Sequence, residues 1–347
     1  MGSDKLIFWF EEIGREHNDI VGKKCANLGS MSQMGLPVPP GFAISIDLYR
    51  RFIQETGALK EISRHVTGFV DLKGQGITVY ENLSRNIQSI IEERDMPVGV
   101  QELIRSYYRE LCKKVEIDDV AVSVRSAGTE SRPGMFETYL NVRGTREVLD
   151  KVKKVWASAY TARAIAFRVN KGLPVIGDEL GVAVPKMVNA CSAGISFTVD
   201  PVTGDASKVI IESNWGLGEG VVSGVENVDR FIVKKETLEV MERIVGRKIK
   251  QVSNKRNGVV WEDVSPDKQC LPSLNDEEIK EITRLAMTLE KRLDSPQDIE
   301  WAIDLDFPSP QNIFLLQTRP AKVAVKSPKS TTDHIAEMMA KGFKTFR

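Results

Sequence analysis

The 347-residue chain has few of the residues that mark metal, disulfide or nucleophilic sites. Its four cysteines are widely separated and show no Cys-x-x-Cys spacing, so we expect reduced thiols rather than a disulfide framework or a zinc site. Only three histidines are present, and none lies near a cluster of Cys, Asp or Glu. We therefore expect surface positions, not ligands or bases, for His17, His65 and His334.

The chain also lacks net charge and long apolar runs. Lysine plus arginine, and aspartate plus glutamate, each number 48, so the formal net charge is zero. A broad electrostatic attraction to nucleic acid or to an anionic membrane is therefore not expected. No segment approaches the roughly 20 apolar residues of a membrane span, and the first apolar run is too short for a secretion signal. We expect a cytoplasmic chain that binds anions through locally placed groups.

What the chain does contain is a helix-rich first half. Apolar residues recur at helical spacing near 77–94 and 98–113, and again over 146–170 with a break expected near Thr161. A later helix is marked by a capping-box pattern that begins at Asn275 and is expected to run to about Leu293.

The second half is rich in strands. From Val182 onward, short β-rich runs are punctuated by Gly, Asn and Asp, a pattern typical of an antiparallel or mixed sheet. The sequence thus predicts an α+β fold class with three parts. These are a helix-rich lobe over 1–181, a β-rich lobe over 182–322, and a polar tail or linker over 323–347.

A polar stretch, RSAGTESRPGMFET, directly follows the apolar strand-like run VAVSV. In this stretch Arg125 can donate two parallel hydrogen bonds to phosphate, Gly134 permits close approach of the backbone, and Thr138 offers a hydroxyl. The alternative is a solvated turn whose arginines pair with acids such as Glu130. The residues themselves leave both interpretations open.

Two further segments have features suited to nucleotide binding. VGKKCANLGSM, residues 21–31, places Lys24 at the start of a helix whose free N–H groups favour anions, although many helices begin this way without a ligand. ESNWGLGEGVVSG, residues 212–224, surrounds Glu219 with glycines, which predicts a loop that another group approaches closely.

The last two expected strands, DIEWAIDL and IFLLQTRP, also carry polar groups. Alternate side chains of a strand share a face, so pairing of these strands would bring Glu300, Gln317 and Arg319 together. Such a set could hold Mg²⁺ and a polyphosphate, because Mg²⁺ prefers hard oxygen ligands. The alternative is a solvated sheet face with an ordinary Glu–Arg pair.

Taken together, five ordered segments resemble the ATP-binding domain of the phosphoenolpyruvate synthase and pyruvate phosphate dikinase family, over about residues 10–322. The segments are GKKCANLGSMSQMGLPVPPGFAIS, VSVRSAGTESRPGMFETYLNV, AGISFTVDPVTG, WGLGEGVVSG, and DIEWAIDL with LLQTRP. The resemblance implies an ATP-grasp fold, in which two lobes enclose a cleft for ATP and Mg²⁺.

The resemblance also implies roles at matching positions. Lys24 and Arg125 would hold phosphates and Arg319 would stabilise the transferring phosphoryl group, which makes these three the catalytic candidates. Glu300 and Gln317 would bind the metal. The remaining nucleotide-binding candidates are Gly134, Thr138, Glu219 and, beside adenine, the backbone of Lys186, Met187 and Val188.

Two positions depart from the family pattern. Lys23 stands where the family has a second glycine, and Pro185 stands where a glutamine usually precedes Lys186. The second change removes a polar side chain and an N–H group beside the expected position of adenine.

Members of this family pass phosphate through a histidine on another domain, and none of the three histidines here has that sequence context. We therefore expect a separate phosphohistidine-bearing subunit, with a small-molecule acceptor bound by that partner. Phenol is the first candidate acceptor, because one subunit of phenylphosphate synthase resembles only this ATP-binding portion. The alternatives are pyruvate or an antibiotic such as rifampicin and, from another class, a non-catalytic nucleotide-binding regulatory subunit.

Overall fold

The computed structural model describes residues 5–67, 72–74, 76–130, 132, 134–222, 227–255 and 258–323. Apart from its first residue, the tail expected over 323–347 lies outside these ranges, as does His334. Within them, no helix is long and apolar enough to cross a membrane.

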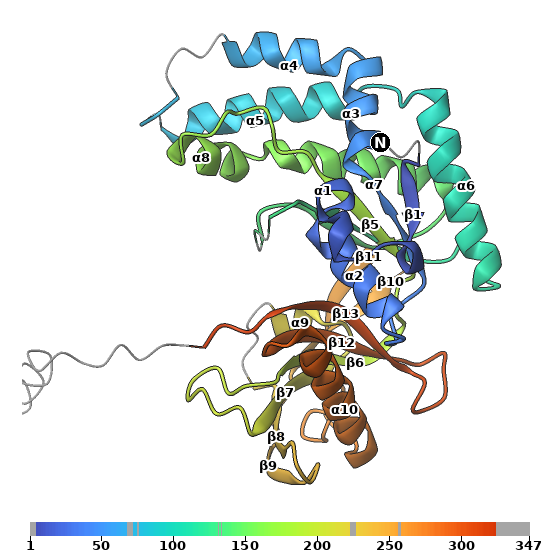
Figure 1. Cartoon of the computed structure of the whole chain (residues 1–347), viewed down its shortest axis with the longest axis vertical. Coiled ribbons are helices and arrows are strands. Elements are labelled where there is room, and N and C mark those ends of the chain that lie inside the picture. The colour runs from blue at the N-terminus through green and yellow to red at the C-terminus, as the bar shows by residue number, and fades with distance from the viewer. Residues whose placement is uncertain are drawn as a thin grey trace, which may run out of the picture.

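The first half is a five-stranded antiparallel sheet covered by helices (Figure 1). Its strand order is β1–β2–β5–β3–β4, with β1 Ile7–Trp9, β2 Gly41–Ile44, β3 Val122–Ala127, β4 Thr138–Val142 and β5 Gly181–Pro185. The helices are α1 Asn18–Val21, α2 Lys23–Gln33, α3 Ile46–Glu55, α4 Ala58–Thr67, α5 Ile77–Glu92, α6 Val98–Lys114, α7 Thr145–Ala157 and α8 Ala162–Asn170.

Apolar periodicity explains the helices of this half. The stripe of α5, formed by Tyr80, Leu83, Ile87 and Ile91, is buried in the core of this half, where α5 packs against α4, α7 and α8. The expected break at Thr161 is confirmed, because its hydroxyl accepts a hydrogen bond from the Ala164 N–H at 3.3 Å and begins α8.

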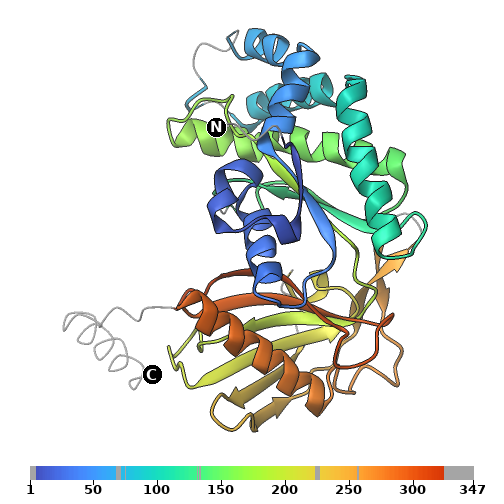
Figure 2. The same ribbon diagram turned by 45° about the vertical axis from the view of Figure 1, so that its right-hand side comes forward.

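The second half contains a six-stranded antiparallel sheet with α10 packed on it (Figure 2). The order is β13–β12–β6–β7–β8–β9, with β6 Ala190–Phe197, β7 Lys208–Trp215, β8 Asp229–Lys234, β9 Val240–Ile244, β12 Gln297–Asp304 and β13 Ile313–Pro320. The other elements are α9 Glu219–Val222, α10 Asp276–Leu293 and a separate hairpin of β10 Lys250–Lys255 and β11 Gly258–Asp263. The mixture of helices and sheets confirms the predicted α+β class.

The capping box of α10 forms as expected. The Asn275 side chain accepts from the Glu278 N–H at 2.9 Å, and the Glu278 carboxylate accepts from the Asn275 N–H at 2.8 Å. The helix ends at Leu293, where Asp294 adopts the left-handed conformation that often follows a helix.

The chain crosses between the sheets slightly later than the predicted lobe boundary at 181–182. Strand β5 pairs with β2 and β3 and therefore belongs to the first sheet. Its run GVAVP is fully buried, so its composition resembles that of the strands that follow it. The passage to the second sheet thus occupies residues 186–189.

Candidate functional site

A cavity of about 310 Å³ is lined by residues from both sheets. The eleven residues expected at a nucleotide site all line it: Lys24, Arg125, Gly134, Thr138, Lys186, Met187, Val188, Glu219, Glu300, Gln317 and Arg319. These residues come from segments that lie far apart in the sequence, and the fold brings them to one hollow.

Arg125 links the two sheets across this cavity. From β3 of the first sheet, its guanidinium donates to the Leu316 carbonyl and to the Gln317 side-chain oxygen, each at 3.3 Å. It also lies 3.7 Å from the Glu300 carboxylate. The turn interpretation is therefore wrong for Arg125, whereas Arg132 does pair with Glu130.

A β-bulge provides one of the acceptors for Arg125. On the β12–β13 ladder Gln317 pairs with Glu300 and Leu315 pairs with Trp301, so Leu316 is an extra residue in β13. A bulge leaves a residue outside the regular ladder. The Leu316 carbonyl is consequently available to Arg125.

Gly134 and Thr138 belong to the opposite wall. Thr138 is the cross-strand neighbour of Arg125 on the β3–β4 ladder. Gly134 has a φ of +65°, a conformation that glycine adopts without steric cost. Strand pairing thus places Thr138 beside Arg125, and Gly134 lies in the loop that leads into β4 and also lines the cavity.

Of the three side chains expected to meet on β12 and β13, two are neighbours and the third, Arg319, has a different partner. Glu300 and Gln317 are direct cross-strand neighbours, as the alternation pattern predicts. Arg319 lies opposite Asp298 instead, and its Nε donates to Asp298 Oδ2 at 2.7 Å. Sequence reasoning missed Asp298, although its position two residues before Glu300 places it on the same strand face.

Lys24 enters the cavity from the first turn of α2. Gly22 precedes this helix with a φ of +81°, and a Cβ atom there would collide with the Ala127 carbonyl. The close approach brings the N-terminus of α2 to the polar loop, where the Lys23 N–H donates to the Gly128 carbonyl at 2.8 Å. Burial, together with the charge of Arg125, lowers the pKa of Lys24 from 10.5 to about 8.

Glu219 begins α9 on another wall of the cavity. Burial raises the pKa of its carboxyl group, the charge of Arg125 lowers it, and the charge of Glu300 adds to the increase. Two carboxylates and two cations therefore influence one another in the same space, and a bound polyphosphate with a divalent cation would satisfy both signs.

The segment expected beside adenine has fewer free groups than anticipated. The Lys186 N–H donates to the Pro40 carbonyl and the Met187 N–H to the Ala121 carbonyl, each at 2.7 Å. The Lys186 ammonium lies 3.2 Å from the Asp304 carboxylate and is buried. Among the described residues no partner is found for the Val188 N–H, so this group remains as a donor for a ligand.

The oxygen donors on the β12–β13 wall fit a magnesium ion. Within the described ranges, no group of three or more His, Cys, Asp or Glu could hold a metal. Glu300 and Gln317 offer a carboxylate and an amide oxygen side by side, with Glu219 on the same cavity. Mg²⁺ commonly takes one or two carboxylates together with waters and substrate phosphates, which matches this set.

The two described histidines take no part in the cavity lining. His17 accepts a hydrogen bond from the Gly14 N–H at 3.1 Å, and His65 lies in α4. Neither is placed to receive a group from a ligand in the cavity.

A family model and several curated relatives place the chain in the same protein family. The model of the pyruvate phosphate dikinase AMP/ATP-binding domain matches residues 18–340. Curated relatives include a phosphoenolpyruvate synthase of Aeropyrum pernix, which is 38% identical over an alignment of 353 positions that covers 92% of this chain and 42% of that protein. A probable phosphoenolpyruvate synthase of Staphylothermus marinus is 37% identical over an alignment of 370 positions, which covers 97% of this chain and 44% of that protein.

A probable phosphoenolpyruvate synthase of Methanocaldococcus jannaschii is 37% identical over an alignment of 337 positions, which covers 94% of this chain and 27% of that protein. The chain thus spans less than half the length of each of these relatives. The matched length and the identities show that the chain belongs to the pyruvate phosphate dikinase AMP/ATP-binding domain family.

Proposed function

We propose that this chain is the ATP-binding part of a dikinase with an ATP-grasp fold. In this proposal it transfers a phosphoryl group from Mg-ATP to a histidine on a separate carrier domain. The observation that carries the proposal is the meeting of Lys24, Arg125 and Arg319 with the Glu300–Gln317 oxygen pair in one cavity between two sheets. Phosphoryl transfer requires such positioning and charge neutralisation more than covalent chemistry from the protein.

Each group has a defined part in this mechanism. Lys24 and Arg125 bind phosphate oxygens, and Gly134 lets the backbone approach them. Arg319, oriented by Asp298, stabilises the charge on the phosphoryl group in transit. Glu300 and Gln317 hold Mg²⁺, which supplies charge neutralisation on the phosphates.

The base end of the nucleotide has fewer specific contacts. In this proposal adenine lies against the 186–188 segment, with the Val188 N–H as its backbone donor. Pro185 contributes no N–H group there.

Pyruvate is the final acceptor in this proposal, in place of phenol. The overall reaction then converts ATP, pyruvate and water to AMP, phosphate and phosphoenolpyruvate, with the phosphohistidine as intermediate. The names of the curated relatives support this choice.

The test uses ATP labelled at the β-phosphate. The chain is mixed with the histidine domain of a similar phosphoenolpyruvate synthase, and transfer of label to that domain is measured. We expect the unchanged chain to label the histidine and Arg319→Ala to lose most of that transfer while still binding Mg-ATP. Arg284→Ala is the matched control, because Arg284 lies on α10 and pairs with Glu281 away from the cavity.

The remaining alternatives give different outcomes in the same assay. A purely regulatory nucleotide-binding chain would bind Mg-ATP but label no histidine. With the complete complex, AMP formation should depend on pyruvate. Dependence on phenol or rifampicin instead would reassign the acceptor without changing the ATP-binding role.

A further inference from the structure

The glycine-rich segment that carries Glu219 is held from outside the cavity. Leu217, Gly218 and Glu219 line the cavity. Behind them, the Leu217 N–H donates to the Val252 carbonyl at 2.8 Å, and the Gly216 N–H donates to the Cys191 carbonyl at 2.9 Å. The position of this segment therefore depends on where residues 250–252 lie.

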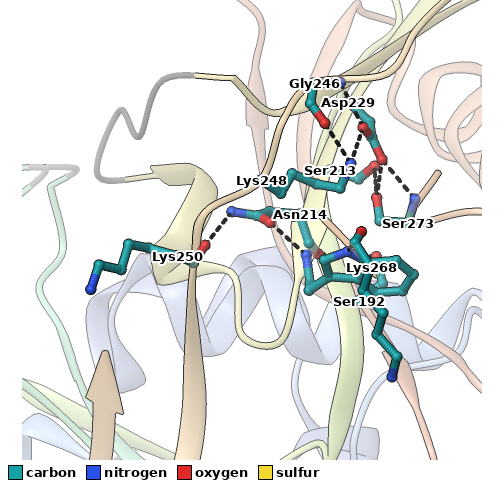
Figure 3. A network of polar contacts seen from close by, with 10 residues as sticks. Ser192, Ser213, Asn214, Asp229, Gly246, Lys248, Lys250, Lys268 and Ser273 are labelled. Atoms are coloured by element: carbon teal, nitrogen blue, oxygen red, sulfur yellow. Dashed lines mark hydrogen bonds and ion pairs between the residues drawn. The ribbon is translucent and has the colours of Figure 1, made fainter. Parts of the chain in front are cut away.

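Asn214 fixes the start of this segment (Figure 3). Its side chain is buried, its oxygen accepts from the Trp215 N–H at 2.8 Å, and its nitrogen donates to the Lys250 carbonyl at 3.1 Å. Ser192 adds a hydroxyl bond to the Asn214 carbonyl at 3.1 Å. The end of β7 is thereby tied to the beginning of β10.

A fully buried ion pair anchors the approach to β10 in turn. Lys248 Nζ lies 2.6 Å from Asp229 Oδ1, and both side chains are 0% exposed. The same Asp229 oxygen accepts from the Gly246 N–H at 3.0 Å, and the Lys248 ammonium also donates to the Gly246 carbonyl at 2.9 Å.

The other Asp229 oxygen holds the turn before α10. It accepts from the Ser273 N–H at 2.6 Å and from the Ser273 hydroxyl at 2.7 Å. The Ser273 hydroxyl in turn lies 2.7 Å from that of Ser213, the residue before Asn214 (Figure 3). Both oxygens of this buried carboxylate are thus hydrogen-bonded.

Stability alone does not account for this ion pair. Removing two charges from water carries a desolvation penalty that can exceed their attraction, and apolar replacements of buried pairs are often neutral or stabilising. An ion pair constrains the direction of the backbone that carries it, whereas an apolar pair does not. Here that backbone leads within four residues to Val252, the acceptor for Leu217.

We propose that Asn214 and the Asp229–Lys248 pair are positioning residues that hold the 216–219 segment against the cavity. Through this segment they keep the Glu219 carboxylate beside Arg125 and Glu300. This inference rests on the proposed function, because it assumes that Mg-ATP occupies the cavity that Glu219 lines.

The test removes both charges together, since removing one would leave the other buried and unpaired. In Asp229→Asn/Lys248→Met we expect the Leu217 amide to exchange with solvent about tenfold faster, and the Kd for Mg-ATP to increase several-fold. Amides in the middle of β8 should keep their protection. The matched control is Lys235→Met/Glu290→Gln, which removes a 2.6 Å ion pair outside the cavity lining and should change neither quantity.

Unchanged Leu217 exchange in a folded double variant would overturn the positioning role. A failure of the unchanged chain to bind Mg-ATP would instead overturn the proposed function, while the exchange measurement would still decide the positioning role. If the double variant does not fold, Asn214→Ala tests the same path. Its control is Gln251→Ala, whose side-chain nitrogen donates to Ser253 and Glu262 of the hairpin.

Discussion

Burial, together with the charge of Arg125 in the same cavity, determines how Lys24 ionises. Its folded-state pKa of about 8 lies below the ordinary lysine value of 10.5. Between these two values the unfolded chain binds more protons, so the contribution of Lys24 to stability increases as pH rises through this window. A bound polyphosphate acts in the opposite sense, because it favours the charged ammonium.

Mg-ATP binding should therefore take up protons near pH 8. We expect an uptake of about half a proton per ATP there, since about half of Lys24 is uncharged at its pKa. Calorimetric titrations in two buffers with different ionisation enthalpies measure this number. Lys24→Arg should abolish the uptake, because arginine stays charged, whereas Lys23→Arg should leave it unchanged. The same uptake in Lys24→Arg would contradict the assignment.

Asp298 should affect phosphoryl transfer more than ATP binding. Asp298→Asn replaces a carboxylate by a neutral acceptor for Arg319, whose side chain is 40% exposed, so that solvent partly screens the lost attraction. Allowing for solvent screening, we expect the transfer rate to fall about tenfold and the Kd for Mg-ATP to change less than about threefold. Label transfer and calorimetry measure the two quantities. An equal loss in both would indicate a general disturbance of the cavity instead.

Among the elements, α10 has helix-end signals at both of its ends. Its capping box, its acidic first turn and its basic last turn agree with the preferences of helix ends. Ile279, Ile282 and Leu289 then bury its apolar stripe in the core with the strands of the second sheet.

Removal of the Asn275 cap tests how much this signal stabilises α10. Asn275→Ala should lower the free energy of unfolding by about 1 kcal/mol, because the Glu278 N–H loses its acceptor. Asn275→Ser, which retains a capping oxygen, should recover most of this loss. Urea titrations followed by circular dichroism give both values, and equal stability of the alanine and serine variants would show that the cap contributes nothing.

Across the whole molecule, the two halves share a core through α2. Buried residues of this helix, including Leu28 and Met31, belong to the same cluster as Phe231 and Val233 of β8 and Trp301 of β12. We name this cluster the shared core. The halves therefore have a common apolar interior beside the cavity that lies between them.

Met31→Ala should accordingly destabilise both halves together. Met31 is 1% exposed, and its truncation should cost about 2–5 kcal/mol. Circular dichroism reports mainly on the first half, which contains most of the helices. The urea transition that it measures should coincide with the transition measured by hydrogen exchange of amides in the second sheet. Two separated transitions would contradict a shared core. Val79→Ala, at the edge of the first-half core, is a suitable control.

Local features of the fold were predictable because their causes lie within a few residues. The α5 stripe, the break at Thr161 and the Asn275 capping box each depend on neighbours within about one or two helical turns. Alternation along 297–304 likewise directs the side chains of Glu300 and Trp301 to opposite faces of the sheet, whichever strands lie beside it. The eleven residues predicted from the ordered motifs all line the cavity.

Pairings between distant segments were not predictable from the same patterns. The hydrogen bond from Arg125 to Gln317 joins residues 192 positions apart. The neighbouring acceptor, the Leu316 carbonyl, belongs to a residue that the bulge leaves outside the regular β12–β13 pairing. Strand β5 has the composition of the second half yet lies in the first sheet, and Asp298 rather than Glu300 binds Arg319. Periodicity specifies which face of a strand or helix is apolar. Which strands pair, and in what register, depends on burying those faces together, and that requires the packed molecule.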